Sequence, residues 1–381
     1  DALASKPDVA FICNPSSLHL ETAIQVANSN IHFFVEKPLC TDNINLIRLE
    51  NLVNQKQLVN MVGFQSRFNP AVLYVKKLID NSKKLNVLVK KGPLNCTIID
   101  AGIKIKGSEQ AGKLIAEICM GGLGKINLKK TNTFPHWPLE TKVESKHPVI
   151  SCLASQYAGW NLSHEKFYAL ASGPGRAIAR REELFKDLQY VDQSKFVYLV
   201  MEVDKTPPKE IIEKISNDCK TTAENIILIL TPTQSISGVI QVVSRVSEVG
   251  LHKLHTLKFP LENVEEVCGS APIPPVSKDF ITSMGRTNDA ILYGGNVELK
   301  VRGTDEQISK LAKNLPSTSS KDYGKPFAEI FKNYKGDFYA IDPNLFSPGK
   351  VTITSLETNK IFVEGKLNSD LLDKSFGYEK S

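Results

Sequence analysis

A chain of 381 residues has room for two or three domains and can bury a substantial core. Its 41% hydrophobic and 23% charged residues are ordinary for a soluble globular protein. The formal net charge of +6 comes from scattered lysines rather than a concentrated basic patch, so the composition predicts no nucleic-acid partner.

The lengths of the apolar runs predict no membrane span, and the cysteines favour a reducing compartment. No apolar run reaches the length of a membrane span, and no signal peptide opens the chain. The seven cysteines are odd in number and form no C-x-x-C pair, which disfavours both a disulfide framework and a zinc site. Because the chain begins with Asp1 and not with methionine, we expect its natural start to lie upstream.

The first 70 residues alternate between two kinds of periodicity. Short apolar runs typical of buried parallel strands occur at 8–13, 32–35 and 58–64, and apolar residues at helical spacing occur at 18–27 and 43–54. Strands separated by helices pair in parallel through right-handed crossovers. Residues 1–70 are therefore predicted to form a partial α/β segment.

Three motifs in this segment resemble the Gfo/Idh/MocA family of NAD(P)-dependent oxidoreductases. They are residues 7–19, which contain Asn-Pro-Ser-Ser, residues 35–38 with Glu-Lys-Pro, and residues 63–70. The resemblance implies the later strands of a Rossmann domain, with Lys37 near the nicotinamide. No strand with G-x-G-x-x-G precedes residue 8, and that family's substrate domain is also missing. We therefore expect residues 1–70 to be a half-Rossmann remnant that does not bind NAD(P).

The pattern changes after residue 70. A helix is predicted from Ala71 to Lys84, with Asn69 as its cap and Pro70 in its first turn. Short strands then alternate with helices; the strands are predicted at 86–90, 95–100, 196–202 and 225–230, and the helices at 111–119 and 208–219. The seam between the two parts lies between residues 70 and 85, so residues 71–381 form the second predicted domain.

Residues 231–250 place a turn rich in hydroxyl groups directly before a mostly apolar helix, predicted from Ser237 to about Lys253. Arg245 and Glu248 stand three residues apart, so their side chains leave the same face of this helix. An arginine and a glutamate that are buried must be paired or functional. From the spacing alone, a structural ion pair and a catalytic pair both remain open.

Four segments together resemble the methenyltetrahydromethanopterin cyclohydrolases, and the resemblance extends from about Leu85 to the C-terminus. They are residues 244–250, 270–275, 284–290 and 293–295. The resemblance implies a two-lobed α+β cyclohydrolase fold, preceded here by the partial α/β (half-Rossmann) segment. It assigns the reaction to Arg245 and Glu248, although Ser247 and Val249 depart from the family pattern. It also implies a small-molecule pterin substrate, a homotrimer, the cytoplasm, one-carbon metabolism as in methanogenesis, and no nucleic-acid or membrane partner.

Under this resemblance, further polar residues are candidates for binding the pterin. Residues 285–289 are predicted to form a turn that contacts the pterin edge, although Asn and Asp also favour a capped helix start and Asp289 could equally buttress the site. The turn at 231–238 suits pterin or phosphate contacts, with helix capping as the structural alternative. The candidates for substrate binding are Thr233, Ser235, Arg286, Thr287, Asn288, Asp289 and, for an acidic tail of the substrate, Arg176.

The chemistry of such a substrate explains the choice of a glutamate and an arginine. Its cationic amidinium carbon bridges N5 and N10 and is electrophilic without a metal or another cofactor, so neither is expected. Hydrolysis needs a water with a proton acceptor in reach and later a proton for N10, and one carboxylate serves both steps. We expect Glu248 to be this acid–base group and Arg245 to orient it by charge pairing.

Two other functions are weighed against hydrolysis. An NAD(P)-dependent oxidoreductase built on residues 1–70 would lack the loop that binds the pyrophosphate. A pterin-binding protein without activity is disfavoured because Arg245 and Glu248 are both retained.

Overall fold

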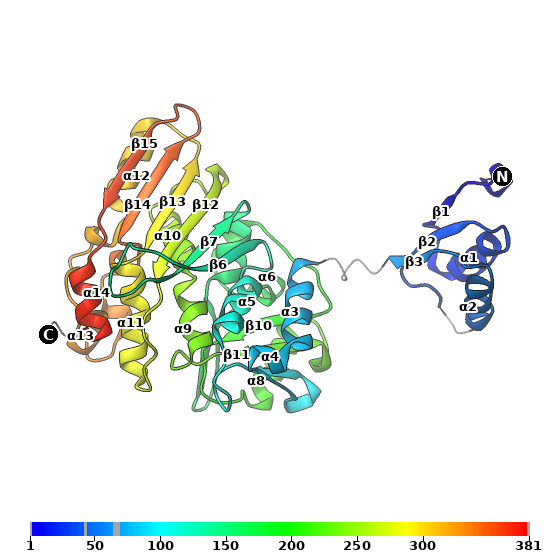
Figure 1. The fold of residues 1–381 in the computed structure, drawn as a ribbon, viewed down its shortest axis with the longest axis horizontal. Helices are drawn as coiled ribbons and strands as arrows, with labels where there is room; N and C mark the ends of the chain where they lie inside the picture. The colour runs from blue at the N-terminus through cyan, green and yellow to red at the C-terminus, as the bar shows by residue number, and fades with distance from the viewer. Residues whose placement is uncertain (1, 42–43, 64–68, 379–381) are drawn as a thin grey trace. The chain divides into compact units, whose positions relative to one another are not determined.

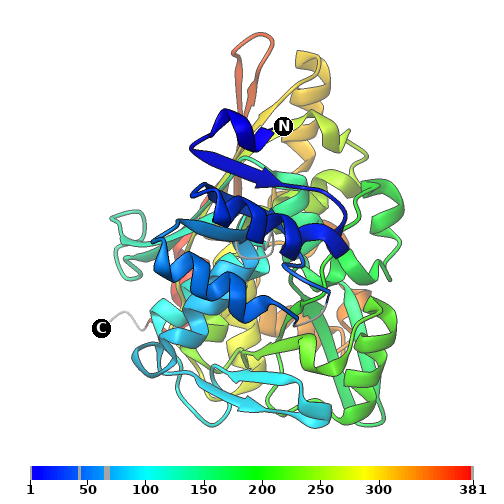
Figure 2. The same cartoon turned by 90° about the vertical axis from the view of Figure 1, so that its right-hand side faces the viewer.

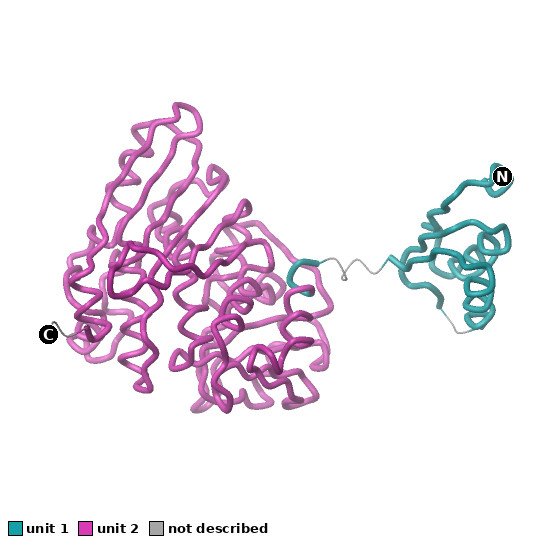
Figure 3. The backbone as a smooth tube through the Cα atoms, viewed as in Figure 1, with its two compact units in different colours: residues 1–72 teal, residues 73–381 magenta. Residues whose placement is uncertain are grey.

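The chain divides into two compact units, which Figure 3 distinguishes by colour. The computed structural model describes residues 2–41, 44–63 and 69–378. The first unit is Asp1–Val72 and the second is Leu73–Ser381. The described residues of each unit form hydrophobic clusters of their own, so each unit is a separately packed body.

The first unit contains the three strands and two helices that the sequence predicts. β1 (Val9–Ile12), β2 (His32–Glu36) and β3 (Asn60–Gly63) pair in parallel in the order β1-β2-β3. α1 (His19–Asn28) and α2 (Leu46–Gln55) connect the strands. The parallel pairing through helical crossovers confirms the partial α/β segment.

The sheet of the first unit buries one of its faces. Phe33 and Val35 of β2 pack with Ala23 and Ala27 of α1 in a small core. On the opposite face Phe11 is 74% exposed. A sheet with an open apolar face buries little apolar surface per residue, and that surface is the main source of stability in a small domain.

The first sheet of the second unit has six strands in the order β4-β5-β11-β10-β9-β8. They are β4 (Leu88–Lys91), β5 (Thr97–Asp100), β8 (Trp160–His164), β9 (Phe167–Ser172), β10 (Val197–Met201) and β11 (Ile226–Leu230). β5, β11 and β10 run parallel, and the outer strands pair antiparallel. The isoleucines of α8 (Lys209–Cys219) pack on one face. The carboxyl ends of the parallel strands therefore meet at one edge, where the following loops can build a site.

The second sheet also has six strands, in the order β15-β14-β13-β12-β7-β6. They are β6 (Gly124–Lys130), β7 (Leu139–Ser145), β12 (Val264–Pro272), β13 (Asn296–Val301), β14 (Lys350–Ser355) and β15 (Ile361–Gly365). β13 and β14 pair in parallel, and the other described pairs are antiparallel. β14 and β15 form a hairpin that projects from one end of this unit in both views (Figures 1 and 2).

Further α-helices and one π-helix among the described residues pack around and between the two sheets of the second unit (Figure 1). They are α3 (Pro70–Asp80), α4 (Ser82–Leu85), α5 (Glu109–Cys119), η5 (a π-helix, Val149–Gln156), α6 (Gly175–Ala179), α7 (Leu184–Leu188), α9 (Ile236–Val243), α10 (Val246–Thr256), α11 (Phe280–Leu292), α12 (Asp305–Asn314), α13 (Phe327–Asn333) and α14 (Ser369–Phe376). Val246 and Leu251 of α10 share a core with Val297 and Ile353 of the second sheet. Two sheets with two cores make the second unit a two-lobed α+β domain.

The single helix predicted from Ser237 to about Lys253 is wrong, because the structure has two helices there. α9 ends at Val243, and α10 begins at Val246. Side chains from other elements hold Ser244, which lies between the two helices. The Gln156 amide donates to the Ser244 carbonyl at 3.0 Å, and the Thr141 and Ser244 hydroxyls lie 2.9 Å apart. Arg245 therefore occupies a junction rather than the middle of a helix.

The separate cores predict that the second unit folds without the first. The two large clusters of the second unit contain described residues from Cys96 onward, so a chain that starts at Asn69 should keep its melting temperature. Calorimetry of the full chain should show an earlier, smaller transition that this truncation removes. A single transition that the truncation lowers would contradict the separation of the two units.

Candidate active site

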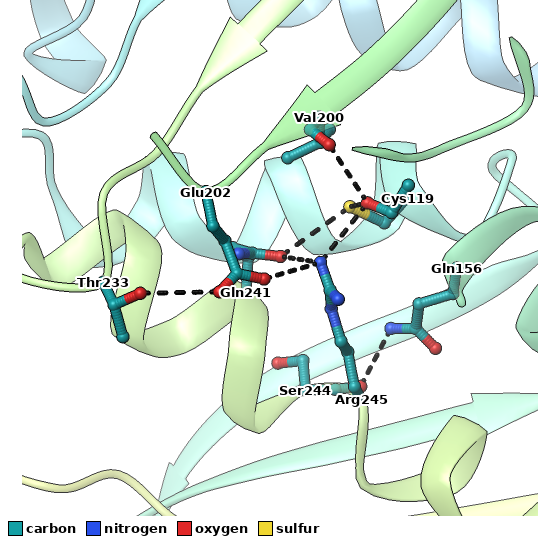
Figure 4. A network of polar contacts seen from close by, with 9 residues as sticks. Cys119, Gln156, Val200, Glu202, Thr233, Gln241, Ser244 and Arg245 are labelled. Carbon is teal, nitrogen blue, oxygen red and sulfur yellow. Dashed lines mark hydrogen bonds and ion pairs between the residues drawn. The ribbon is translucent and has the colours of Figure 1, made fainter. Parts of the chain in front are cut away.

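Arg245 extends from the junction of α9 and α10 into a polar cluster beside the first sheet (Figure 4). Its Nη2 atom donates to Gln241 Oε1 at 3.1 Å and to Ser172 Oγ at 3.3 Å, and it pairs with Glu202 Oε1 at 3.1 Å. These partners come from α9, the end of β9 and the segment after β10. Only 8% of the Arg245 side chain is exposed, so its charge depends on these partners for compensation.

Glu202 belongs to this polar cluster, although the sequence motifs did not single it out as a candidate. Its side chain is 30% exposed, and its Oε2 atom accepts a hydrogen bond from Thr233 Oγ1 at 3.4 Å. A signal was present, because Glu202 follows a fully buried strand that runs parallel to the strand before Thr233. The carboxyl ends of neighbouring parallel strands lie at the same edge of a sheet, which places both residues together.

Glu248 lies in the first turn of α10 and is 4% exposed. Within the part of the chain that the structure describes, no hydrogen-bond or ion-pair partner contacts its carboxylate. Burial raises the pKa of Glu248 to about 7, and the charges of Arg245 and Arg176 offset part of that rise. The expected pairing of Arg245 with Glu248 is therefore wrong, because Arg245 pairs with Glu202 instead.

Buried polar atoms without a hydrogen-bond partner gather on α9, α10 and the segments beside them. Among the described residues they include Gln156 Oε1, Thr231 Oγ1, Gln241 Nε2, Arg245 Nε and Ser247 Oγ. Buried polar groups in folded proteins are nearly always hydrogen-bonded. A concentration of unpaired ones marks a place where water or a ligand completes the bonding.

Thr233 and Ser235 both lie in the turn between β11 and α9, but only Thr233 joins the arginine cluster. Ser235 caps α9: its Oγ atom accepts from the Gly238 N–H at 3.0 Å and donates to the Pro232 carbonyl at 2.8 Å. A Cβ atom at position 238 would lie 2.1 Å from the Pro232 oxygen, so the turn requires glycine there. The Ser235 hydroxyl is thus committed to the fold.

The turn predicted at residues 285–289 is wrong, because these residues lie inside α11. The side chains of Thr287 and Asn288 donate to carbonyls one turn earlier in the same helix. Arg286 donates to the carbonyls of Pro275 and Ser375. Because internal acceptors use these donors, contact of Arg286, Thr287 and Asn288 with a substrate stays a prediction.

Asp289 has the buttressing role that the sequence analysis kept as an alternative. Its carboxylate is fully buried and accepts hydrogen bonds from the Phe327 N–H at 2.9 Å and from the Ser375 hydroxyl at 2.6 Å. It thereby joins α11 to α13 and α14. Burial raises the pKa of Asp289 to about 7, while the two donors act in the opposite direction.

Arg176 lies fully buried in α6, with its donors in use. It pairs with Glu182 through Nε at 2.8 Å and through Nη2, and its Nη1 atom donates to the carbonyls of Leu153 and Ser155 at 2.9 and 3.2 Å. Its guanidinium lies 5.1 Å from the centre of the Tyr157 ring. This burial is at odds with the expected contact to an acidic tail, because no part of the Arg176 side chain is exposed.

The described residues contain no group of three or more histidine, cysteine, aspartate and glutamate side chains that could hold a metal ion. They also contain no helix long and apolar enough to cross a membrane.

Comparison with known proteins defines the class of this chain. The model of the family described as Cyclohydrolase (MCH) matches residues 68–376, and the chain belongs to that family. The model of an oxidoreductase family with an NAD-binding Rossmann fold matches residues 1–64. The two-part make-up predicted from the sequence motifs is therefore confirmed.

Relatives named methenyltetrahydromethanopterin cyclohydrolase are similar over nearly their whole length. The protein from Methylobacillus flagellatus is 59% identical over 80% of this chain and 93% of its own. The protein from Xanthobacter autotrophicus is 49% identical over 80% and 90%, and that from Methanocaldococcus jannaschii is 38% identical over 81% and 97%. A solved UDP-N-acetylglucosamine 3-dehydrogenase from Acidithiobacillus ferrooxidans is 28% identical over 20% of this chain and 26% of its own, with a TM-score of 0.19.

The buried Asp289 predicts a specific pH dependence of stability. Its pKa of about 7 in the folded chain exceeds its ordinary value of 3.8, so its contribution to stability is full below about pH 3.8 and is lost as the pH rises through 7. Asp289→Asn keeps an acceptor but cannot ionise. Between pH 5 and pH 8, wild type should therefore lose about 3 kcal/mol of unfolding free energy that the variant does not lose. Urea unfolding at both pH values measures this difference, and parallel pH curves would contradict it.

Proposed function

We propose that this chain catalyses the reversible hydrolysis of 5,10-methenyltetrahydromethanopterin to the 5-formyl compound. The observation that carries the proposal is the unpaired, buried carboxylate of Glu248, which lies three residues from an arginine already held by Glu202. The relatives described above are named for this activity, and this chain matches 90% or more of the length of each. The proposal is therefore supported both by the site and by the similarity.

Glu248 supplies the acid–base chemistry in this proposal. It takes one proton from a water as the water oxygen bonds to the amidinium carbon between N5 and N10. The bond from that carbon to N10 then breaks, and N10 receives a proton. One water proton ends on N10 and the other is released to solvent, so the cation becomes a neutral formyl compound.

Glu202 and Arg245 keep Glu248 in the state that this chemistry requires. A glutamate paired directly with an arginine would have a depressed pKa and would be a weak base. Because Arg245 is committed to Glu202, its charge acts on Glu248 without a direct bond. A carboxylate with a pKa of about 7 is ionised in part at neutral pH and is basic enough to take a proton from water.

The wider setting follows from the resemblance to the cyclohydrolases. We propose a homotrimer in the cytoplasm, a tetrahydromethanopterin derivative as the substrate, and no metal, other cofactor, nucleic acid or membrane in the reaction. Thr233 is assigned to the site through its contact with Glu202. The substrate supplies its own electrophile, so the proposal needs no group beyond the side chains named here.

Replacing Glu248 tests the proposal directly. Glu248→Gln keeps the shape but removes the base, so kcat should fall by about two to four orders of magnitude in an assay that follows loss of the methenyl absorbance. Glu265→Gln removes an exposed carboxylate from β12 and should leave kcat unchanged. In wild type, kcat/KM should rise with pH through about 7, since Glu248 must be ionised. Near-normal turnover in folded Glu248→Gln would refute the assignment.

Replacing Glu202 should change the pH profile as well as the rate. Glu202→Gln removes a negative charge and frees Arg245 to approach Glu248, and both effects lower the pKa of Glu248. The rise of kcat/KM should therefore move below pH 7, and the plateau should fall by about tenfold because the base is weaker. Glu266→Gln breaks an exposed pair with Lys300 and is the matched control. An unshifted pH midpoint in Glu202→Gln would show that Glu202 has only a structural role.

A further inference from the structure

The cluster around Arg245 is polar, yet the substrate proposed for it is a flat ring system attached to the amidinium. Thr233, Gln241, Ser172 and Glu202 offer hydrogen bonds but no ring or broad apolar surface. A pterin held by polar groups alone would keep its two faces in water. An apolar surface continuous with the cluster would complete the binding.

Strand β9 provides such a surface. Side chains two residues apart in a strand leave the same face of the sheet, so Ser172, Leu170 and Tyr168 form one row. Their neighbours Ala171, Ala169 and Phe167 belong to the core on the opposite face. The row begins at Arg245, which donates to Ser172, and then becomes exposed and apolar: Leu170 is 37% exposed and Tyr168 is 53% exposed.

The pairing of β9 with β10 ties this row to Glu202 as well. Val200 pairs with Ser172 and Met201 with Ala171, so Glu202 and Leu170 are the next residues along the two antiparallel chains. The exposed Leu170 is therefore next to Glu202 across the two strands, and the Glu202 carboxylate can attract a cation. Steps of two residues in a strand are about 7 Å long, so Leu170 and Tyr168 lie within about 14 Å of Ser172, which matches the reach of a substrate with fused rings.

A second aromatic side chain reaches the far end of this row from the other lobe. Tyr339, in the 3-10 turn Phe338–Ala340, is 84% exposed. It lies close enough to Tyr168 that, after burial, its hydroxyl is the next cause that raises the pKa of Tyr168. The turn is anchored by Phe338, whose ring stacks on Phe346 at 4.7 Å. Two exposed tyrosines that lie near each other, one from each lobe, bury no core, so their position is explained better by a ligand than by stability.

We propose that Leu170 and Tyr168, closed at the far end by Tyr339, form an apolar wall against which the pterin ring of the substrate lies while its amidinium faces Arg245, Glu202 and Glu248. This assignment rests on the proposed function and deepens it, because it names residues that bind the substrate without taking part in the acid–base steps. Stacking of a flat heteroaromatic ring on a tyrosine contributes about 1–3 kcal/mol, which corresponds to roughly five- to 150-fold in affinity.

The test separates binding from chemistry. Tyr168→Ala should raise KM by roughly five- to 150-fold and leave kcat within about threefold, whereas Tyr168→Phe, which keeps the ring, should have nearly the wild-type KM. Leu170→Ala should raise KM by a smaller factor. Val363→Ser, at a β15 residue that is also 53% exposed, is the control and should change neither constant.

Binding can also be measured without turnover in a chain that already carries Glu248→Gln. There, Tyr168→Ala should weaken the dissociation constant of methenyltetrahydromethanopterin by the same factor as it raises KM. An unchanged KM in Tyr168→Ala, or a loss in Tyr168→Phe as large as in Tyr168→Ala, overturns the wall. Absence of hydrolysis in wild type would overturn the proposed function itself. Normal hydrolysis in wild type, with a KM that does not change in Tyr168→Ala, would overturn only the wall.

Discussion

The ion pair between Arg245 and Glu202 is the interaction on which the rest of the site depends. Two carboxylates, Glu202 and Glu248, are candidate partners for Arg245, and Glu248 is the nearer in sequence. On a continuous helix, residues three apart are neighbours, and Arg245 would pair with Glu248. The break at Ser244, held by Gln156 and Thr141, removes that geometry and leaves Arg245 beside the end of β10. A buried ion pair contributes little net stability. The consequence of this pair is that it leaves the Glu248 carboxylate without a direct bond to Arg245.

The sequence predicted the elements well where one physical signal dominates. The apolar runs of β5, β10 and β11 and the helical spacing of α5 and α8 place these elements within a few residues of their observed bounds. The helix break could not be read in this way, because the side chains that hold Ser244 come from residues 141 and 156, about 100 residues away in the chain. Local periodicity carries no information about such distant contacts.

The candidate site was predicted in part for the same reason. Arg245 and Glu248 stand out as charges in an apolar segment, whereas Glu202 is a single acidic residue after a strand and gains its meaning only from the pairing of β10 with β11. The prediction of a turn at residues 285–289 was wrong because it relied on the preference of Asn and Asp for turns and caps. In α11 their preference is overridden: Asn288 bonds back within the helix, and Asp289 bonds to Phe327 and Ser375.

Buried charges in this chain fall into two groups that differ in how completely they are hydrogen-bonded. Arg176 and Asp289 have protein partners for their charged atoms and join elements of the fold. Arg245 retains an unpaired Nε, and the Glu248 carboxylate has no hydrogen-bond or ion-pair partner among the described residues. Unpaired groups cost stability, so their persistence beside one another is explained by a substrate or water that completes them.

The charge of the proposed substrate couples binding to the protonation of Glu248. A cation placed beside this carboxylate favours its ionised form, so the arriving methenyl compound should lower the pKa of about 7 that the empty site imposes. After ring opening the bound compound is neutral, and the pKa returns toward its value in the empty site. Glu248 is thus a base when the substrate is cationic and a proton donor when the product is neutral, which is the alternation that a reversible hydrolysis requires of one carboxylate.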